Sequence, residues 1–470
     1  MTRGSLEFSD GTILLKGWTK AAIIQVFQDD FWRWDARVDA WRCEASRYSE
    51  IIARWQAADG PQAHGLYLEN HVPKWLAIQW PKVELPTLRD EQQEAVAAWL
   101  DKQAGVVVMP TGTGKTEVAL QIMAKIGCST LIVSPVRDLM YQWHRRILRG
   151  LGYDAGVIGD NTFNLRPVSV TTYDSAAIHM PTLGNRFELL IFDECHHLPG
   201  RFRSDAARMS IATRRLGLTA TPERSDGRHH DLERLIGPVV FSLSIAQVRG
   251  RSLAEYDIVR IPVHLSDCEQ ALYDQLSREV SQYIYARRQE SPLFSWKDLC
   301  AESAVDPESR RALSSYRRKQ AIENRATEKL RLLEDLFRLH QGSPMIIFVG
   351  SNAMARDVSQ RFLIPCLLSH CGKKERLDYL EGLRDHSYPA IVANQVLDEG
   401  VDLPAVKVAV VIGGMASKKQ AKQRLGRILR RQDNQRAVLY EVVCQDTTES
   451  QRSRQRRNND AYTGTRHRRL

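Results

Sequence analysis

Short apolar runs alternate with longer helical stretches through most of this 470-residue chain. In the first half these runs occupy residues 106–109, 130–134, 168–172, 189–193 and 216–220, and in the second half residues 345–349, 390–394, 406–412 and 437–443. Strands that are apolar on both faces and separated by helices are typical of parallel sheets. The pattern therefore predicts an α/β protein with two parallel-sheet domains, over residues 83–245 and 246–450.

A long segment of the second domain departs from this alternation. Residues 268–333 lack such apolar runs and have the character of helices. Eight basic and two acidic residues lie between Arg310 and Arg331. We expect a helical insertion here.

Residues 1–82 form a separate region that holds seven of the ten tryptophans. In FWRWDARVDAWR, residues 31–42, tryptophans are interleaved with arginines, an arrangement that suits stacking on nucleic-acid bases. The same stretch has the two-residue period of a strand with one buried face, and acidic residues about balance basic ones in this region. We expect a small domain in which most of these rings pack in the core, with base stacking as the alternative.

Charge is unevenly distributed. Lysine and arginine exceed aspartate and glutamate by 66 to 56, and residues 452–470 alone contain seven arginines and one aspartate. We expect residues 451–470 to form a basic, disordered tail, which either remains solvated or binds phosphate groups.

Composition also excludes several classes of protein. The eight cysteines include no CxxC pair, which argues against a zinc ribbon, an iron–sulfur helicase and a disulfide framework. No apolar run approaches the roughly 18 to 20 residues needed to span a bilayer, and the first 20 residues lack the apolar core of a signal peptide. We therefore expect a cytoplasmic protein without a membrane partner.

Residues 109–116, Met-Pro-Thr-Gly-Thr-Gly-Lys-Thr, follow an apolar strand and open a helix, which is the context of a phosphate-binding loop. The glycines let backbone N–H groups turn toward phosphate oxygens, and the lysine reaches the β and γ phosphates. The final threonine offers its hydroxyl to Mg²⁺. We expect ATP and Mg²⁺ as cofactors, held here by Thr111, Gly112, Thr113, Gly114, Lys115 and Thr116.

Two carboxylates come at the end of the apolar run 189–193, where sheets of this kind bind ligands. Asp193 is placed to hold Mg²⁺, and Glu194 to orient or deprotonate the attacking water. Phosphoryl transfer needs positioning and charge neutralisation more than covalent chemistry. A charged loop with no catalytic role is the alternative, which the phosphate-binding loop upstream disfavours.

A third candidate group lies in the second α/β domain, in the segment QRLGRILR at 423–430. Arg427 and Arg430 share one helical face, and guanidinium groups near the γ-phosphate stabilise the charge of the transition state. Gln423 opens the same segment and is a further catalytic candidate. Taken alone, the segment fits a solvated basic helix equally well, and only the whole set of motifs favours catalysis.

Several shorter segments complete that set. Gln92, in LRDEQ with Arg89, precedes the phosphate-binding loop and is placed to read the adenine. Thr219 and Thr221 form a TAT sequence after a further strand. The segment VLDEGVDLP, at 396–404, follows in the second domain.

In order and spacing this constellation resembles the superfamily 2 helicases, which implies two RecA-like domains with ATP bound between them. By that resemblance Gly400 and Asp402 join the nucleotide-binding residues, while Thr219, Thr221 and His196 couple hydrolysis to movement. The sequences DECH, TAT and QRLGRILR each differ from those of the DEAD-box RNA helicases.

Within that superfamily the chain is similar to the XPB family in its compact archaeal form. The likeness runs from residue 7 to about 445 and is carried by DGTILLKG (10–17), RYSEIIARW (47–55), LGNRFELLIFDECHHLP (183–199), RLGLTATPERSDGRH (215–229) and QVLDEGVDLP (395–404). It implies that residues 1–82 are a damage-recognition-like domain and that residues 268–333 hold a thumb.

The resemblance also implies ATP-driven 3′ to 5′ movement on DNA with duplex opening, in repair or in a process linked to transcription. Expected partners are forked, duplex or single-stranded DNA and a Bax-type nuclease. We expect a monomeric motor associated with the nucleoid. The thumb residues Arg317, Arg318 and Lys319 are candidate DNA contacts.

One departure from the family pattern concerns strand separation. XPB proteins carry an Arg-Glu-Asp triplet after the TAT motif, assigned to wedging the duplex apart, and this chain has Arg224, Ser225 and Asp226 there. These residues remain candidate DNA contacts, but the central carboxylate is missing. A duplex translocase with little strand separation is therefore an alternative. A DNA-binding module that uses ATP as a conformational switch is another.

Overall fold

The computed structural model describes residues 2–27, 31–57, 65–224, 226–248, 256–368, 370–394, 406–413, 437–457 and 467–469. Six of the residues singled out above lie outside these ranges: Ser225, Gly400, Asp402, Gln423, Arg427 and Arg430. The chain divides into two compact units, Met1–Ser244 and Ile245–Leu470.

The first unit begins with a five-stranded sheet in the order β3-β4-β2-β1-β5, in which only β1 and β5 pair in parallel. Its elements are β1 (Thr2–Ser9), β2 (Thr12–Lys16), α1 (Lys20–Phe27), β3 (Arg33–Asp35), β4 (Ala40–Glu44), α2 (Tyr48–Ala57) and β5 (Leu66–Asn70). Most of the tryptophans pack in or against its core, as predicted: Trp18, Trp32, Trp41, Trp55 and Trp75. Trp34 is half exposed, in edge contact with Trp41.

An eight-stranded sheet follows in the order β13-β6-β12-β11-β7-β10-β8-β9, parallel except for the β8–β9 pair. Its strands are β6 (Ala104–Val108), β7 (Thr130–Ser134), β8 (Gly156–Gly159), β9 (Thr162–Phe163), β10 (Val168–Thr172), β11 (Leu189–Asp193), β12 (Arg214–Thr219) and β13 (Val239–Ser242). The predicted strands are confirmed, and the five central ones are apolar on both faces because helices cover both sides of the sheet.

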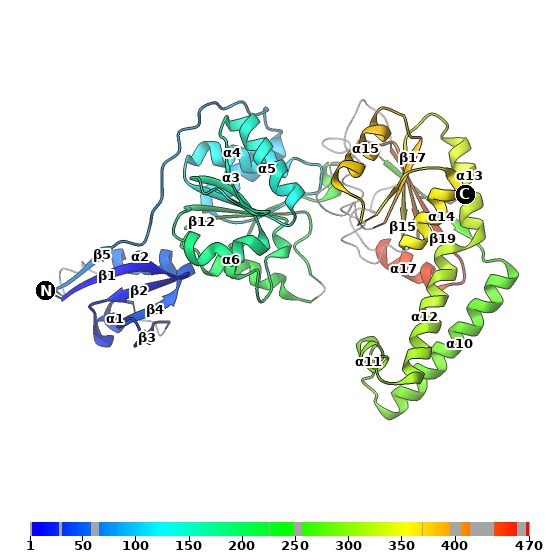
Figure 1. Cartoon of the computed structure of the whole chain (residues 1–470), viewed down its shortest axis with the longest axis horizontal. Helices are drawn as coiled ribbons and strands as arrows, with labels where there is room; N and C mark the ends of the chain where they lie inside the picture. The colour runs from blue at the N-terminus through cyan, green and yellow to red at the C-terminus, as the bar shows by residue number, and fades with distance from the viewer. Residues whose placement is uncertain are drawn as a thin grey trace. The chain divides into compact units, whose positions relative to one another are not determined.

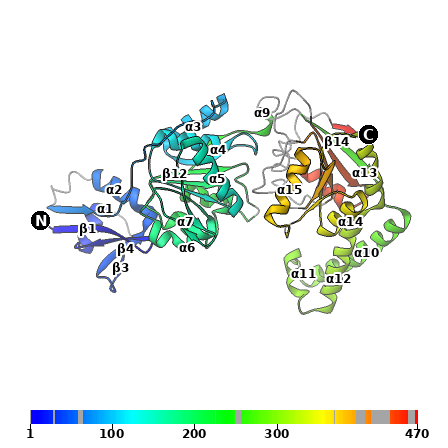
Figure 2. The same ribbon diagram turned by 45° about the horizontal axis from the view of Figure 1, so that its top comes forward.

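Helices cover this sheet on opposite faces, as Figures 1 and 2 show for α3–α5 and α6. The helices of the unit are α3 (Asp90–Lys102), α4 (Lys115–Ile126), α5 (Arg137–Leu151), α6 (Tyr173–Leu183), α7 (Asp205–Arg208) and α8 (Asp231–Leu235). Both α4 and α5 end at a glycine in the left-handed conformation, Gly127 and Gly152, which is the usual way to stop a helix.

The second unit is built on a seven-stranded parallel sheet in the order β16-β17-β15-β18-β19-β14-β20. Its strands are β14 (Tyr256–Val263), β15 (Met345–Val349), β16 (Cys366–Leu367), β17 (Ala390–Ala393), β18 (Val408–Ile412), β19 (Ala437–Cys444) and β20 (His467–Arg469). The predicted fold class, an α/β protein with two parallel-sheet domains and a small N-terminal domain, is confirmed.

The helices of the second unit include a long hairpin that projects from the sheet (Figures 1 and 2). We call α10, α11 and α12 the arm. The described helices of the second unit are α9 (Ile245–Val248), α10 (Asp267–Glu290), α11 (Trp296–Glu302), α12 (Pro307–Arg325), α13 (Thr327–Leu339), α14 (Asn352–Phe362), α15 (Lys373–Arg384) and α17 (Thr448–Arg457). A capping box between Ser266 and Glu269 begins α10. Among the described residues, no helix has the length and apolar character needed to cross a membrane.

The C-terminal residues differ from the expected disordered tail. Residues 448–457 form helix α17, and residues 467–469 pair with β14 as β20. Ser453 is fully buried. The expectation was wrong for these residues because tertiary hydrogen bonds hold a segment whose composition alone favours solvent.

Candidate ATP-hydrolysing site

The phosphate-binding loop joins β6 to the first turn of α4. Gly112 and Gly114 have φ of +86° and +84°, the left-handed conformation that suits glycine. A Cβ on Gly114 would lie only 2.3 Å from Nε2 of Gln92. The loop therefore requires glycine at 114 both for its backbone conformation and for close packing.

Gln92 is buried and holds this loop to the start of α3. Its Nε2 donates to the carbonyl oxygen of Thr113 at 2.8 Å, and its Oε1 accepts from the backbone N–H of Arg89 at 2.9 Å. Thr113 donates from its own hydroxyl to Pro110 O at 2.7 Å. Gln92 and Thr113 thus brace the loop. The adenine contact predicted for Gln92 remains a prediction.

Lys115 connects the loop to the acidic motif. Its Nζ donates to the carbonyl oxygen of Met109 at 3.1 Å and lies 3.9 Å from Oε1 of Glu194. Thr116 follows in the first turn of α4 and is partly exposed. The structure therefore brings together the lysine and the glutamate that the sequence assigned to one site.

Asp193 ends β11 and is fixed by three neighbours. Its Oδ2 accepts from the indole N–H of Trp143 at 2.9 Å, and its Oδ1 accepts from the backbone N–H of Glu194 at 3.0 Å. Its carbonyl oxygen accepts from the Tyr173 hydroxyl at 2.9 Å. Burial, followed by the charge of Glu194, raises the pKa of Asp193, and the Trp143 hydrogen bond acts in the opposite direction.

Trp143 and Tyr173 were not among the predicted site residues. Each lies on a helix that covers the sheet, α5 and α6, where an aromatic ring is more often part of the core. Both rings are indeed buried, and only their polar atoms reach Asp193. The backbone of Glu194 adopts φ of +47°, an uncommon conformation for this residue type that turns the chain sharply after the strand.

A chain of contacts leads from the acidic motif to the TAT sequence. His196 Nδ1 lies 3.5 Å from Oε2 of Glu194 and 3.0 Å from Oγ1 of Thr219. The Thr219 hydroxyl donates to the carbonyl oxygen of Thr221 at 3.1 Å. The contacts are short because β11 and β12 are neighbours in the sheet.

The same motif contacts the segment after the TAT sequence. Arg224 donates to the carbonyl oxygen of His196 at 2.6 Å and forms two hydrogen bonds with Asp226, of 2.9 and 2.7 Å. The guanidinium holds the pKa of Asp226 well below its usual range. Glu194, His196 and Arg224 therefore form one connected series.

The predicted DNA contacts on the arm differ from one another. Arg317 and Arg318 are exposed on α12. Lys319 is buried, with its Nζ 5.3 Å from the ring centroid of Tyr273, and burial lowers its pKa. The expectation that Lys319 faces DNA was wrong, because Lys319 lies on the buried face of α12 with Ser315 and Glu323, which are four residues before and after it.

The residues present fit ATP and Mg²⁺. Among the described residues, the buried Thr111 hydroxyl lacks a hydrogen-bond partner, and the loop presents backbone N–H groups at the start of α4. The described part of the chain holds no cluster of three or more His, Cys, Asp or Glu residues suited to a metal. Mg²⁺ binds proteins through one or two carboxylates together with substrate phosphates, and Asp193 and the Thr116 hydroxyl are the groups that would hold it here.

Family models match three parts of the chain. Residues 6–61 match the xeroderma pigmentosum group B helicase damage recognition domain, and residues 309–463 the ERCC3/RAD25/XPB C-terminal helicase. Residues 85–224 match the type III restriction enzyme, res subunit.

Solved structures with a similar fold include the helicase domain of Pyrococcus furiosus Hef, with a TM-score of 0.55 and 16% identity over 78% of this chain and 97% of that one. Another is S. cerevisiae Dbp5 bound to RNA and ADP BeF3, with a TM-score of 0.55 and 14% identity over 82% and 90%. At these identities the likeness shows the fold alone.

Relatives share more of the sequence. The DNA 3′-5′ translocase XPB2 of Sulfurisphaera tokodaii is 41% identical over 371 residues, which cover 79% of this chain and 84% of the relative. The DNA 3′-5′ helicase XPB of Kineococcus radiotolerans is 30% identical over 374 residues, covering 77% and 60%. Together with the two XPB domain matches, this identity shows that the chain belongs to the XPB family of helicases.

Proposed function

We propose that this chain is a DNA-dependent ATPase that translocates 3′ to 5′ on DNA and opens or remodels duplexes, in repair or in a process linked to transcription. The observation that carries the proposal is the connected series from Lys115 and Glu194, through His196, to Thr219 and Arg224. A change at the γ-phosphate would reach the segment after the TAT sequence through these contacts. The names of its relatives support DNA as the polymer.

In hydrolysis, Lys115 binds the β and γ phosphates and the loop N–H groups bind their oxygens. Thr116 and Asp193 would hold Mg²⁺, which supplies charge neutralisation of the phosphates when bound. Glu194 lies beside Lys115 and orients the attacking water or accepts its proton. Gln92 keeps the loop in place through Thr113.

The second domain contributes the remaining groups of the proposal. We expect Arg427 and Arg430 to stabilise transition-state charge, Gln423 to support them, and Gly400 and Asp402 to contact the nucleotide. Exposed arginines on the arm, Arg317 and Arg318, are suited to phosphates of the DNA backbone. A monomeric motor associated with the nucleoid, and a Bax-type nuclease partner, follow from the family resemblance.

The test is ATP hydrolysis at one fixed salt concentration, alone and with single-stranded, duplex and forked DNA and single-stranded RNA. We expect stimulation by DNA, and loss of hydrolysis in Lys115→Ala, because the lysine is the fixed charge on the γ-phosphate. Equal stimulation by RNA would contradict the choice of polymer. Retained turnover in Lys115→Ala would contradict the site.

A second candidate function is duplex translocation with little strand separation. It is favoured by the segment after the TAT sequence, where Arg224 pairs with Asp226 and the residue between them is serine. If the missing carboxylate limits unwinding, Ser225→Glu should raise the number of base pairs opened per ATP hydrolysed. An unchanged ratio in a forked-duplex assay would dismiss this candidate.

A further inference from the structure

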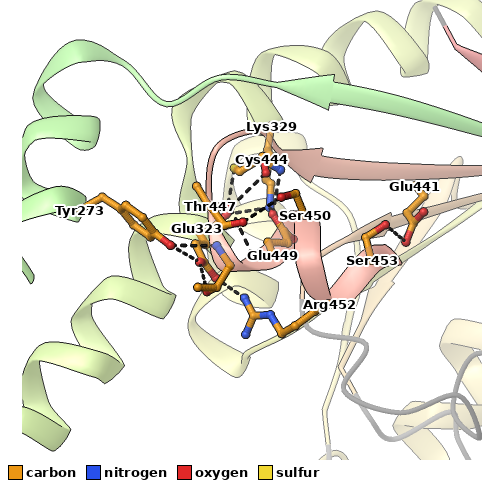
Figure 3. A network of polar contacts seen from close by, with 11 residues as sticks. Tyr273, Glu323, Lys329, Glu441, Cys444, Thr447, Glu449, Ser450, Arg452 and Ser453 are labelled. Carbon is orange, nitrogen blue, oxygen red and sulfur yellow. Dashed lines mark hydrogen bonds and ion pairs between the residues drawn. The ribbon is translucent and has the colours of Figure 1, made fainter. Parts of the chain in front are cut away.

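A polar cluster links the arm to the rest of the second unit, in addition to the Arg325–Asp357 ion pair and the hydrogen bonds of Thr327 to Glu269. Helix α10 leaves the sheet after β14, and α12 returns to it before α13. Tyr273 lies in the second turn of α10, and Glu323 lies near the end of α12. Figure 3 shows that both side chains point toward the start of α17, the C-terminal helix.

Helix α17 contacts the base of the arm through two of its residues, Thr448 and Arg452. Tyr273 Oη donates to Glu323 Oε1 at 2.9 Å and accepts from the backbone N–H of Thr448 at 2.9 Å. The Thr448 hydroxyl donates to the same carboxylate oxygen at 2.6 Å, and Arg452 pairs with the other oxygen. We call Tyr273, Glu323, Thr448 and Arg452 the clasp.

A second group fixes α17 to the domain core. Lys329 Nζ donates to the two carboxylate oxygens of Glu449, at 2.7 and 2.9 Å, and to the carbonyl oxygen of Glu323 at 2.6 Å. Glu449 also accepts from the backbone N–H of Cys444, at the end of β19, at 2.9 Å. We call Lys329 and Glu449 the anchor. On the side away from the arm, Ser453 donates to Glu441 Oε1 at 3.0 Å.

Except for the partly exposed Arg452, these charged side chains are buried. Lys329 and Glu323 are 0% exposed, and Glu449 is 1% exposed. Buried ion pairs add little stability compared with apolar side chains of similar volume, because desolvation offsets their attraction. They do restrict the packing to arrangements that satisfy every donor and acceptor. The three N–H groups of Lys329 all have acceptors here, so moving α17 away would leave buried donors without partners.

The length of the arm amplifies any change at this base. Helix α10 has 24 residues, about 36 Å at 1.5 Å per residue. A rotation of about 10° at the clasp would displace the far end of such a helix by roughly 6 Å. A small change in the contacts at the base would therefore become a large displacement at the far end of the arm.

We infer that the clasp residues are positioning residues, which set the direction of the arm relative to the second sheet and transmit displacement of this domain to DNA on the arm. The C-terminal helix α17 therefore takes part in positioning the arm. The part of this inference that concerns DNA rests on the proposed function. The part that concerns the arm does not.

The first test measures the arm itself, without DNA. One spin label is placed on Cys300, an exposed thiol in α11, and the other on Asp378→Cys, at an exposed position of α15, with Cys268 and Cys366 changed to serine. The double variant Thr448→Val/Arg452→Ala removes the side chains that α17 gives to the clasp and leaves the anchor. We expect the distance distribution to broaden. A distribution as narrow as that of the parent protein would overturn the inference.

Ser453→Ala is the matched control, because it removes a buried hydrogen bond of the same helix on the side of Glu441. Thr448→Ser with Arg452 retained keeps the hydroxyl and is the conservative rescue. Both should give the parent distribution. Broadening in Ser453→Ala as great as in the double variant would mean that general loosening of α17 is responsible, and would also overturn the inference.

The second test measures coupling. In the double variant, basal ATP hydrolysis and the KM for ATP should match those of the parent, while kcat at saturating DNA should fall roughly two- to thirtyfold, the range typical of coupling residues. An unchanged DNA-stimulated kcat despite a broadened distribution would overturn transmission through the clasp. Absence of DNA stimulation in the parent would instead contradict the proposed function, and the spin-label result would still decide the role of the clasp.

Discussion

The structure requires glycine at position 114 for two reasons. The backbone there has a φ of +84°, and a Cβ would collide with Gln92. In Gly114→Ala we expect an unfolding free energy lower by more than about 1 kcal/mol, and weaker ATP binding, because Gln92 must release Thr113. Gly65→Ala is the control, as Gly65 has a φ of +68° and, among the described residues, no atom within 4 Å of the point that a Cβ would occupy. If both variants lower the unfolding free energy in urea and the affinity for nucleotide by the same amounts, the contact with Gln92 is unimportant.

Asp193 depends on a hydrogen bond from outside the recognisable motifs. Trp143→Phe keeps an aromatic ring, although a smaller one, and removes the indole N–H that favours the ionised carboxylate. The pKa of Asp193 should rise further, so that the acid limb of the ATPase pH profile moves to higher pH by about one pH unit, with a greater Mg²⁺ requirement. Trp99→Phe, which removes a hydrogen bond to Arg215 O in the same sheet, is the control. Identical profiles for both variants would contradict this role.

At this scale the sequence predicts which residues lie close together where chemistry dictates both residue type and spacing, and their catalytic roles stay predictions. Lys115 and Glu194 were assigned to one site and lie 3.9 Å apart. Trp143 could not be predicted, because a lone tryptophan on an amphipathic helix normally packs in the core, and this one does so as well. Lys319 was misassigned because a run of basic residues shows its charge but not which member faces inward.

At the scale of elements, the pairing of β11 with β12 places His196 beside Thr219. Thr219→Val keeps the shape and removes the hydroxyl, so basal hydrolysis should persist while stimulation by DNA falls roughly two- to thirtyfold. Thr171→Val is the matched control, since that buried hydroxyl, on β10, donates within the sheet, to Ile158 O and to Thr172 O. Comparable loss in both variants would indicate a defect of the sheet rather than of coupling.

Strands at the centre of each sheet were predictable because both faces are apolar, whereas β14 was missed. Its sequence, YDIVRIPV, contains Arg260 and Pro262, which interrupt the apolar run that marks a buried strand. It nevertheless pairs with β19 along its whole length. Helix α17 was missed for a related reason, because its polar sequence is held by Thr448, Glu449 and Ser453 rather than by an apolar face.

At the scale of the molecule, the two units carry different parts of the proposed motor. The first holds the phosphate-binding loop, the acidic motif and the contacts that lead to Arg224. The second holds the arm and the clasp that sets its direction. A motor of this kind must couple the nucleotide state to the position of DNA. Changes in the coupling contacts of either unit, such as Thr219 or the clasp, should therefore lower the stimulation by DNA while basal hydrolysis persists.

The charge of the whole chain, 66 basic against 56 acidic residues, matters for DNA only where basic side chains are exposed on a surface that contacts DNA, and the arm is one candidate surface. If Arg317 and Arg318 each bind a phosphate, the slope of log affinity against log salt should become shallower in Arg317→Ala/Arg318→Ala, by about 0.9 for each phosphate no longer bound. Arg338→Ala, on α13, removes an exposed arginine outside the arm and should leave the slope unchanged. Fluorescence anisotropy with labelled duplex DNA over a salt series measures both. An unchanged slope in the double variant would mean that DNA is held elsewhere, and that the arm contributes position without direct charge contact.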